Sequence, residues 1–381
     1  MEKRAGNYVN NLSGKLAYRS FRPAPLPPNP GINMDTDMVR ALIDAHKNLA
    51  VLDRLSYRLP NVDLFLSMYV RKEALMSSQI EGTQCTLDDI LDPMVDINAN
   101  QDVEDVVNYV KAMEYAAKRR KTLPISARLL KETHALLMEG VRGEEKNPGE
   151  FRHSQNWIGG LGSTLKTARY IPPNLLDMDK AIADLERFIN ADNDLDPLIE
   201  AALIHYQFET IHPFLDGNGR VGRLLINLFL MERNILGAPT LSISYYLKMN
   251  RMEYYDRMNE VRRNGDYEQW VRFFLSAVSE SAKESIATID ELSALHEEDS
   301  AKLEDLSSRQ KASVERLFAC LESHPILDIG KTASSLGLSY NTVAKAVAIL
   351  EEKGILRPSR KQGKAQIYSY TAYLDILRRG A

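Results

Sequence analysis

The segment 212–223 reads HPFLDGNGRVGR and joins two stretches of helical sequence. The first stretch covers 198–211 and ends at Pro213, and the second begins near Arg220. Two glycines before Arg220 let backbone N–H groups converge at the start of the second helix, where the helix dipole adds positive potential. We therefore expect a helical body that presents an anion-binding helix N-terminus.

The side chains of this segment suit phosphate chemistry. Arg220 and Arg223 are three positions apart, so they lie on one face of the first helical turn, beside the same anion. Asp216 can only accept, which suits Mg²⁺ held partly by phosphate oxygens. His212 can take up a proton near neutral pH. The run 217–222 also spells G-x-G-x-x-G, but a helix precedes it and no acidic residue follows about 20 positions on, which excludes a dinucleotide-binding fingerprint.

Composition excludes several classes of protein. Hydrophobic residues make up 44% and charged residues 26%, as in proteins with a packed core. Cys85 and Cys320 are too few for a disulfide scaffold or a four-cysteine zinc site. The most apolar run, 224–231, is too short to cross a bilayer, and no hydrophobic leader is visible. We expect a soluble cytoplasmic protein without a membrane partner.

The rest of the first 304 residues is expected to be mainly helical. Helical patterns cover about 35–55, 62–81, 103–119, 126–139, 178–190 and 197–211, then begin again near 220 and 252, and run from 267 to beyond 303. Five prolines between 23 and 30 predict an extended arm over the first 35 residues. Two β-capable runs around a glycine-rich centre predict a hairpin over 155–171. A lone hairpin on a helical body is marginal alone, so we expect something to dock on it, the alternative being a surface loop.

Charge sets the C-terminal region apart. The whole chain has a net charge of −4, but residues 305–381 hold 12 basic and 7 acidic residues, so the remainder is acidic. Helices are predicted near 314–321, over 329–336 and over 339–353, with Gly337 as the turn between the last two. Strands are expected at 355–357 and 366–370, around a basic loop at 358–364. This order resembles a winged helix-turn-helix domain.

At every defining position, segment 212–223 matches the motif His-x-Phe-x-Asp/Glu-Gly-Asn-Gly-Arg-x-x-Arg, and roughly 57–275 resembles the Fic family. Most Fic proteins transfer AMP from ATP to a Ser, Thr or Tyr hydroxyl of a target protein and release pyrophosphate. The resemblance implies a mainly α fold: an all-helical Fic core with a β-hairpin flap, followed here by the winged helix. It also implies ATP as substrate and Mg²⁺ as cofactor. Gly219 stands where phosphate-transferring relatives carry Lys, so the chain resembles the nucleotidyl branch.

The resemblance also implies roles for individual residues. His212 would be the base for the target hydroxyl, and Asp216 the Mg²⁺ ligand. The phosphates would be held by Gly217, Asn218, Gly219, Arg220 and Arg223. The flap would align the target by strand addition and place Thr167, Ala168, Arg169 and Tyr170 nearest the nucleotide. Tyr254, the first of a tyrosine pair, would contact the nucleoside.

The run 77–82, SSQIEG, fits the inhibitory pattern Ser/Thr-x-x-x-Glu-Gly/Asn of relatives whose inhibitory helix precedes the motif. Ser77 and Glu81 share one helical face, and Gly82 ends the helix. Glu81 would pair with Arg223 and fill the space that the γ-phosphate of ATP needs. In some relatives this glutamate also positions water for removing AMP, so the reverse reaction remains open.

Three regions are expected: an N-terminal arm with helices (1–110), a catalytic core with the flap (111–303) and the winged helix (304–381). If the winged helix binds DNA, we expect the major groove to hold the side chains of Tyr340, Asn341 and Lys345. The phosphates would then be contacted by Arg360, Lys361 and Lys364. Protein docking or homodimerisation is the alternative role for this region. The leading hypothesis is an autoinhibited protein adenylyltransferase. Its rival is a DNA-binding regulator whose Fic site senses nucleotide without turnover.

Overall fold

The computed structural model describes residues 4–56, 62–94, 100–140, 144–160, 162–363 and 365–379. In the N-terminal part these form β1 (Gly6–Asn11), β2 (Tyr18–Pro23), α1 (Thr36–Ser56), α2 (Val62–Ile80), α3 (Leu87–Leu91), α4 (Gln101–Arg119) and α5 (Ala127–Leu137). The central part holds α6 (Leu175–Asn190), α7 (Pro197–Ile211), α8 (Asn218–Glu232), α9 (Ile243–Met249), α10 (Arg251–Asn264) and α11 (Tyr267–Ala301). Short 3₁₀ turns lie at Gly14–Leu16 and Glu144–Lys146.

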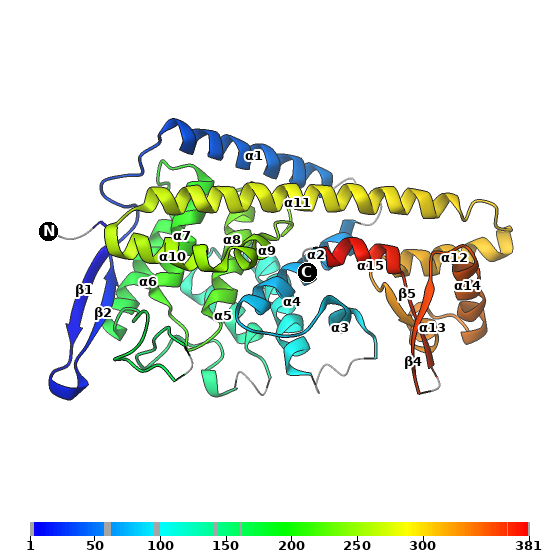
Figure 1. Cartoon of the computed structure of the whole chain (residues 1–381), viewed down its shortest axis with the longest axis horizontal. Helices are drawn as coiled ribbons and strands as arrows, with labels where there is room; N and C mark the ends of the chain where they lie inside the picture. Colours follow the sequence, from blue (N-terminus) through cyan, green and yellow to red (C-terminus); the bar gives the residue numbers. More distant parts are fainter. Residues whose placement is uncertain are drawn as a thin grey trace.

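Helices α7 and α8 form the centre of the molecule. Both are buried on nearly all sides, because apolar side chains surround the helix axis instead of forming one stripe. Helices α2, α4, α5, α6 and α11 pack against this pair, and Figure 1 shows α1 lying along the long helix α11. None of the helices within the described ranges has both the length and the apolar character needed to cross a membrane.

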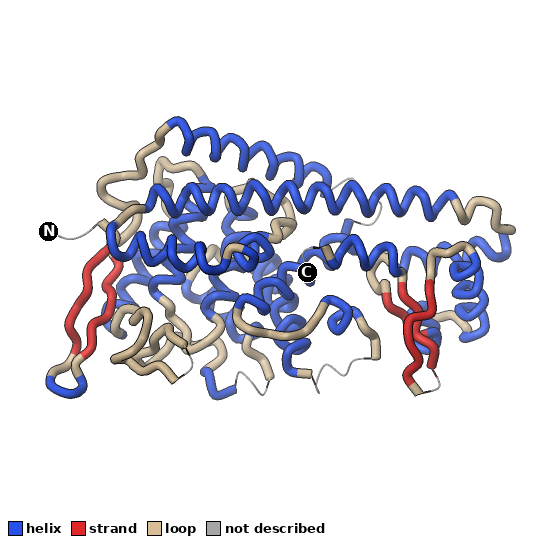
Figure 2. Tube along the Cα trace, viewed as in Figure 1, coloured by secondary structure: helices blue, strands red, loops and turns tan. Residues whose placement is uncertain are grey.

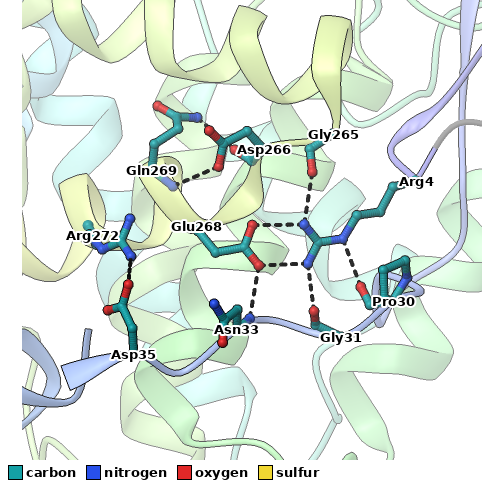
Figure 3. Close-up of polar contacts among 10 residues, drawn as sticks. All are labelled: Arg4, Pro30, Gly31, Asn33, Asp35, Gly265, Asp266, Glu268, Gln269 and Arg272. Atoms are coloured by element: carbon teal, nitrogen blue, oxygen red, sulfur yellow. Dashed lines mark hydrogen bonds and ion pairs between the residues drawn. The ribbon is translucent and has the colours of Figure 1, made fainter. Parts of the chain in front are cut away.

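The N-terminal arm contains a β-hairpin where the sequence predicted only extended chain. Strands β1 and β2 pair antiparallel from Gly6↔Pro23 to Asn11↔Tyr18, at the opposite end of the molecule from the second sheet (Figure 2). Figure 3 shows how the base of the hairpin is anchored: the Arg4 guanidinium pairs with both Glu268 oxygens at 2.8 and 2.9 Å. It also donates to the carbonyl oxygens of Pro30, Gly31 and Gly265. Phe21 N donates to Ile171 O at 3.0 Å, which ties β2 to the end of segment 155–171.

Segment 155–171 does not form the two strands that the sequence predicted. Its described residues show a single antiparallel bridge, Ile158↔Tyr170, and turns elsewhere. Local hydrogen bonds replace a strand ladder: Thr164 N donates to Thr167 Oγ1, and Trp157 Nε1 donates to Ser163 O. Glycine and threonine turns therefore dominate over β propensity here.

The C-terminal part comprises α12 (Ser308–Leu321), β3 (Ile326–Asp328), α13 (Ile329–Leu336), α14 (Tyr340–Glu352), β4 (Arg357–Gln362), β5 (Ala365–Ser369) and α15 (Thr371–Arg378). Its sheet is antiparallel, in the order β3-β5-β4. Ser339 caps α14, its Oγ accepting from Thr342 N at 3.1 Å. The expected basic loop is shorter than predicted, because Arg360 and Lys361 pair within β4 against Ile367 and Gln366 of β5. Lys364 lies outside the described residues.

Candidate active site

The loop between α7 and α8 depends on two residues with positive φ. His212 has a φ of 50° and ends α7, and Gly217 has a φ of 71° at the N-cap of α8. A β-carbon on Gly217 would also lie 2.9 Å from Met138 Sδ, so glycine fits this position in both conformation and space. The loop therefore turns back on itself and directs the first N–H groups of α8 toward the site.

Buried contacts hold this loop in place. Phe214 has no exposed surface, and its ring stacks on the His134 ring with centroids 3.8 Å apart. The Asn218 side chain spans the loop: its Oδ1 accepts from Phe214 N at 2.8 Å and its Nδ2 donates to Phe214 O at 2.9 Å. His134 Nε2 lies 3.1 Å from Asp216 O. Since the Asn218 side chain is fully engaged, its backbone N–H is the group left for an anion.

Arg223 is fully buried and makes three contacts with the end of α2. It donates to Glu81 Oε1 at 2.7 Å, to Ser77 Oγ at 2.8 Å and to Ser77 O at 2.9 Å. Desolvation alone would raise the pKa of the Glu81 carboxyl, but the charge and hydrogen bond of Arg223 outweigh it and hold that pKa below its usual value. The pair that the sequence predicted is therefore brought together, with Glu81 ionised at neutral pH.

Gly219 lies directly beneath this ion pair. A β-carbon at this position would stand 2.1 Å from Glu81 Oε1 and 2.9 Å from Arg223 Nη1. Any larger residue would therefore push the carboxylate off the helix N-terminus. The missing side chain lets Glu81 come as close to the α8 backbone as a bound anion would.

The second arginine of the loop has donors to spare. Arg220 is 6% exposed, lies 3.4 Å from Asp105 Oδ1 and contacts Met138 Sδ at 3.4 Å. Nη1 is the atom that pairs with Asp105, whereas Nε is buried without a hydrogen-bond partner among the described residues. Because an unpaired buried donor is costly, its presence indicates a site that is completed by an anionic ligand.

Glu81 stands between two cavities. One, of about 240 Å³, is also lined by Asp105, Glu139, Asp216 and Arg220. The other, of about 390 Å³, is also lined by Arg169, Tyr170, Glu209, Arg251 and Tyr255. The first holds the polar groups suited to phosphates and a cation, and the second has the aromatic and glycine surfaces suited to a flat ring. Glu81 is the residue that lines both cavities.

The His212 ring is partly buried and uncharged near neutral pH. Burial lowers the pKa of its imidazole to about 4, and the positive charges of Arg152 and Arg262 add to this effect, so the ring is neutral near pH 7. Its Nδ1 is buried without a hydrogen-bond partner within the described residues. Its backbone oxygen accepts from Arg152 Nε at 3.0 Å. The ring is therefore free to accept a proton while the backbone is fixed.

Glu209, which the sequence did not single out, lies one helical turn before His212. It is 6% exposed, and burial raises the pKa of its carboxyl to about 7. Its Oε1 has no hydrogen-bond partner among the described residues and would lie 2.3 Å from a β-carbon on Gly222. A single glutamate in an apolar helix belongs to no sequence motif, so its position beside the site is evident only from the fold.

The four residues of segment 155–171 that were expected nearest the nucleotide lie in two different environments. Arg169 and Tyr170 line the larger cavity, and the Tyr170 hydroxyl donates to Thr210 O at 2.7 Å with the Arg262 guanidinium 3.9 Å from the centre of its ring. Thr167 is exposed and accepts from Thr164 N, and Ala168 is partly exposed beside it.

Of the tyrosine pair, the second residue reaches the cavity. Tyr254 is 1% exposed, and its hydroxyl lies 2.8 Å from His205 Nε2 in the core. Tyr255 follows it on α10 and lines the larger cavity. The Tyr254 side chain, which we expected to contact the nucleoside, is thus packed in the core.

Comparisons with known proteins agree with this geometry. Residues 39–118 match the family model described as Fic/DOC family N-terminal, and residues 124–230 match that described as Fic/DOC family. These two segments contain Glu81 and the whole of the 212–223 loop.

Two curated relatives named protein adenylyltransferase Fic are similar to part of the chain. The protein from Culex quinquefasciatus is 33% identical over 183 residues, which cover 47% of this chain and 33% of that protein. The one from Drosophila melanogaster is 32% identical over 182 residues, again 47% of this chain and 33% of the relative. The chain therefore spans about a third of the length of these relatives.

A solved structure shows the same fold. The crystal structure of a Fic family protein from Desulfovibrio desulfuricans superposes with a TM-score of 0.57 at 20% identity, covering 89% of this chain and 97% of that one. The mainly helical architecture expected from the sequence is confirmed by this likeness.

Proposed function

We propose that the chain is a protein adenylyltransferase, which moves AMP from ATP to a Ser, Thr or Tyr hydroxyl of a target protein. The observation that carries the proposal is Glu81 paired with buried Arg223 between two cavities, at the N-terminus of α8. A carboxylate in this position mimics a phosphate and marks where one binds. The similarity of both matched segments to Fic proteins supports the same conclusion.

In the proposed reaction the target hydroxyl oxygen bonds to the α-phosphorus of ATP as the bond from that phosphorus to the bridging oxygen breaks. Pyrophosphate leaves with the electron pair, and the hydroxyl proton passes to the neutral imidazole of His212. The N–H groups at Gly217, Asn218 and Gly219, with Arg220 and Arg223, hold the phosphates in line. Such transfers depend chiefly on positioning and charge stabilisation, which a rigid helix N-terminus provides.

Mg²⁺ fits this site through one protein ligand. Asp216 is exposed and lines the smaller cavity, and its Oδ1 accepts from Gly217 N at 2.6 Å. No group of three His, Cys, Asp or Glu side chains suited to a metal occurs within the described ranges. Mg²⁺ commonly needs only one or two carboxylates together with substrate phosphates, so Asp216 would hold it. The ion would supply neutralising charge to the phosphate oxygens.

We assign the larger cavity to the nucleoside, with Tyr255, instead of Tyr254, as its aromatic contact and Arg169 and Tyr170 at its flap side. The target segment is proposed to lie along the flap. In this proposal Glu81 inhibits the enzyme and, when displaced, could also orient water for the reverse removal of AMP.

A second proposed activity belongs to residues 304–381, which we interpret as a winged helix that binds DNA. The observation in its favour is an exposed surface on α14 and β4: Tyr340 is 60% exposed, and Asn341, Lys345, Arg360 and Lys361 are exposed as well. Helix starts and basic strands of this kind place side chains in a groove and cations on phosphates. We retain 1–110 and 111–303 as the preceding regions.

Transfer of labelled AMP tests the proposal. The Glu81→Gly variant should label protein in a cell lysate far more strongly than the wild-type chain, because Arg223 is released for the nucleotide. Adding His212→Ala should abolish the label. Tight ATP binding by Glu81→Gly without any protein-bound AMP would instead support the rival reading, a nucleotide sensor attached to a DNA-binding domain.

A further inference from the structure

The residues that follow Glu81 lie against the C-terminal part of the chain. Segment 83–94, which includes α3, runs from the end of α2 toward β4, as Figure 1 shows. Two ion pairs fix it there. Arg378 of α15 holds both oxygens of Asp88 at 2.9 and 2.6 Å, and Arg360 of β4 pairs with Asp92. Lys331 of α13 also donates to Pro93 O.

The other end of this segment is tied to the inhibitory site. Gln79 Nε2 donates to Cys85 O at 2.9 Å, and Gln84 N donates to Asp102 Oδ2 at 3.0 Å. Gly82, directly after Glu81, has a φ of 106° and nothing within 4 Å of where a β-carbon would stand. A displaced α3 would pull on Cys85 and, through Gln79, on the last turn of α2 next to Glu81, and Gly82 has room for the chain to follow.

Helix α2 is held by the C-terminal part directly as well. Lys72, which is 1% exposed, donates to Glu284 Oε1 of α11 at 2.7 Å and to the backbone oxygen of Arg379 at 3.1 Å. Both helix α2, which ends just before Glu81, and the segment after it thus depend on where the C-terminal residues lie.

The Arg360 guanidinium can pair either with the Asp92 carboxylate or with a phosphate. Its guanidinium is half exposed on β4 beside the exposed cations Arg357 and Lys361, where a phosphate backbone would dock. The Asp92 side chain that it covers is only 7% exposed. Because a buried carboxylate without its partner is costly, a phosphate that takes Arg360 would force segment 83–94 to rearrange.

We propose that duplex DNA bound at β4 and α14 relieves the autoinhibition, by drawing Arg360 away from Asp92 and so loosening segment 83–94 and Glu81. This inference rests on the proposed transferase function and adds its regulator. DNA is favoured over an acidic protein because the cations lie along one extended strand and the first turns of α14 expose Tyr340, Asn341 and Lys345.

The test combines AMP transfer with DNA binding. In low salt, a short mixed-sequence duplex should raise AMP transfer by the wild-type chain but not by Glu81→Gly, which is already released. Asp92→Asn should raise basal transfer roughly fivefold, the lower end of typical coupling between sites. It should also tighten DNA binding, since Arg360 no longer has to leave a carboxylate. The matched control Asp305→Asn removes a carboxylate paired with Lys353 within the C-terminal part and should behave as wild type.

Hydrogen exchange separates failure of this inference from failure of the proposed function. DNA should speed exchange at the amides of 82–94 even if no protein is modified. If Glu81→Gly transfers AMP but neither DNA nor Asp92→Asn alters transfer or exchange, the inference is wrong and the transferase function stands. A duplex that does not bind overturns the choice of DNA and leaves the surface to a protein partner. If Glu81→Gly transfers no AMP, hydrogen exchange at 82–94 with and without DNA still shows whether DNA binding is coupled to this segment.

Discussion

Replacing Glu81 with glutamine tests whether this carboxylate occupies a phosphate position. The substitution keeps the side-chain size but removes the charge that Arg223 Nη2 contacts at 2.7 Å. Arg223 retains its two contacts with Ser77, so the arginine should stay in place. The change therefore isolates the competition between Glu81 and the outer phosphate of ATP for one guanidinium.

The size of the effect follows from the exposure of the two partners. A hydrogen bond between charged groups contributes about 1.5–3 kcal/mol when buried. Arg223 is 1% exposed and Glu81 is 40% exposed, so solvent screening reduces the expected value to about 1–2 kcal/mol. Since ATP no longer has to displace a carboxylate, its affinity should rise about 5- to 30-fold.

Calorimetry with ATP and ADP is the assay, performed in a His212→Ala background so that no turnover occurs. The gain should appear for ATP and be small for ADP, because ADP lacks the phosphate that competes with Glu81. Glu280→Gln, an exposed carboxylate paired with Lys283 on α11, is the control and should change neither affinity. An equal gain for both nucleotides, or no gain for ATP, would refute the reasoning.

Two further predictions concern stability. Phe214→Ala should lower the free energy of unfolding by about 3–5 kcal/mol, because the ring has no exposed surface and stacks on His134; a thermal melt with less than a few degrees of change would contradict this. The folded state raises the pKa of the Glu209 carboxyl from 4.5 to about 7, so it favours the protonated form. The stabilisation of the folded state by protonated Glu209 is therefore complete below the unfolded pKa near 4.5 and is lost as the pH rises toward 7. Glu209→Gln should therefore be more stable than wild type at pH 8 and differ little at pH 4, measured by urea unfolding; the same difference at both pH values would argue against a titrating Glu209.

The central helices and the Glu81–Arg223 pair could be predicted from the sequence. Segment 212–223 combines a proline stop with glycines and polar residues, and each of these acts through local geometry. The Glu81–Arg223 contact is not local, and it followed from the resemblance of two motifs to one family. The boundaries of α7, predicted as 197–211, agree with the structure because an N-cap Asp and Pro197 begin it.

What the sequence missed depends on tertiary contacts. The β1–β2 hairpin forms because Arg4 gathers carbonyls from 26 to 261 positions away, which no local pattern encodes. The two strands expected in segment 155–171 do not form, because Thr164 and Thr167 make hydrogen bonds within turns instead. Which tyrosine of the pair faces the cavity was decided by His205, a buried partner 49 positions from Tyr254. Periodicity alone cannot rank two adjacent aromatic residues.

The mass of protein after incubation with ATP and Mg²⁺ shows whether the chain transfers AMP. With Glu81→Gly, the account predicts a protein, the chain itself included, that carries one covalent AMP on a Ser, Thr or Tyr, together with release of pyrophosphate. The same variant with His212→Ala should leave every protein at its original mass. ATP binding by Glu81→Gly with no AMP on any protein would contradict the account.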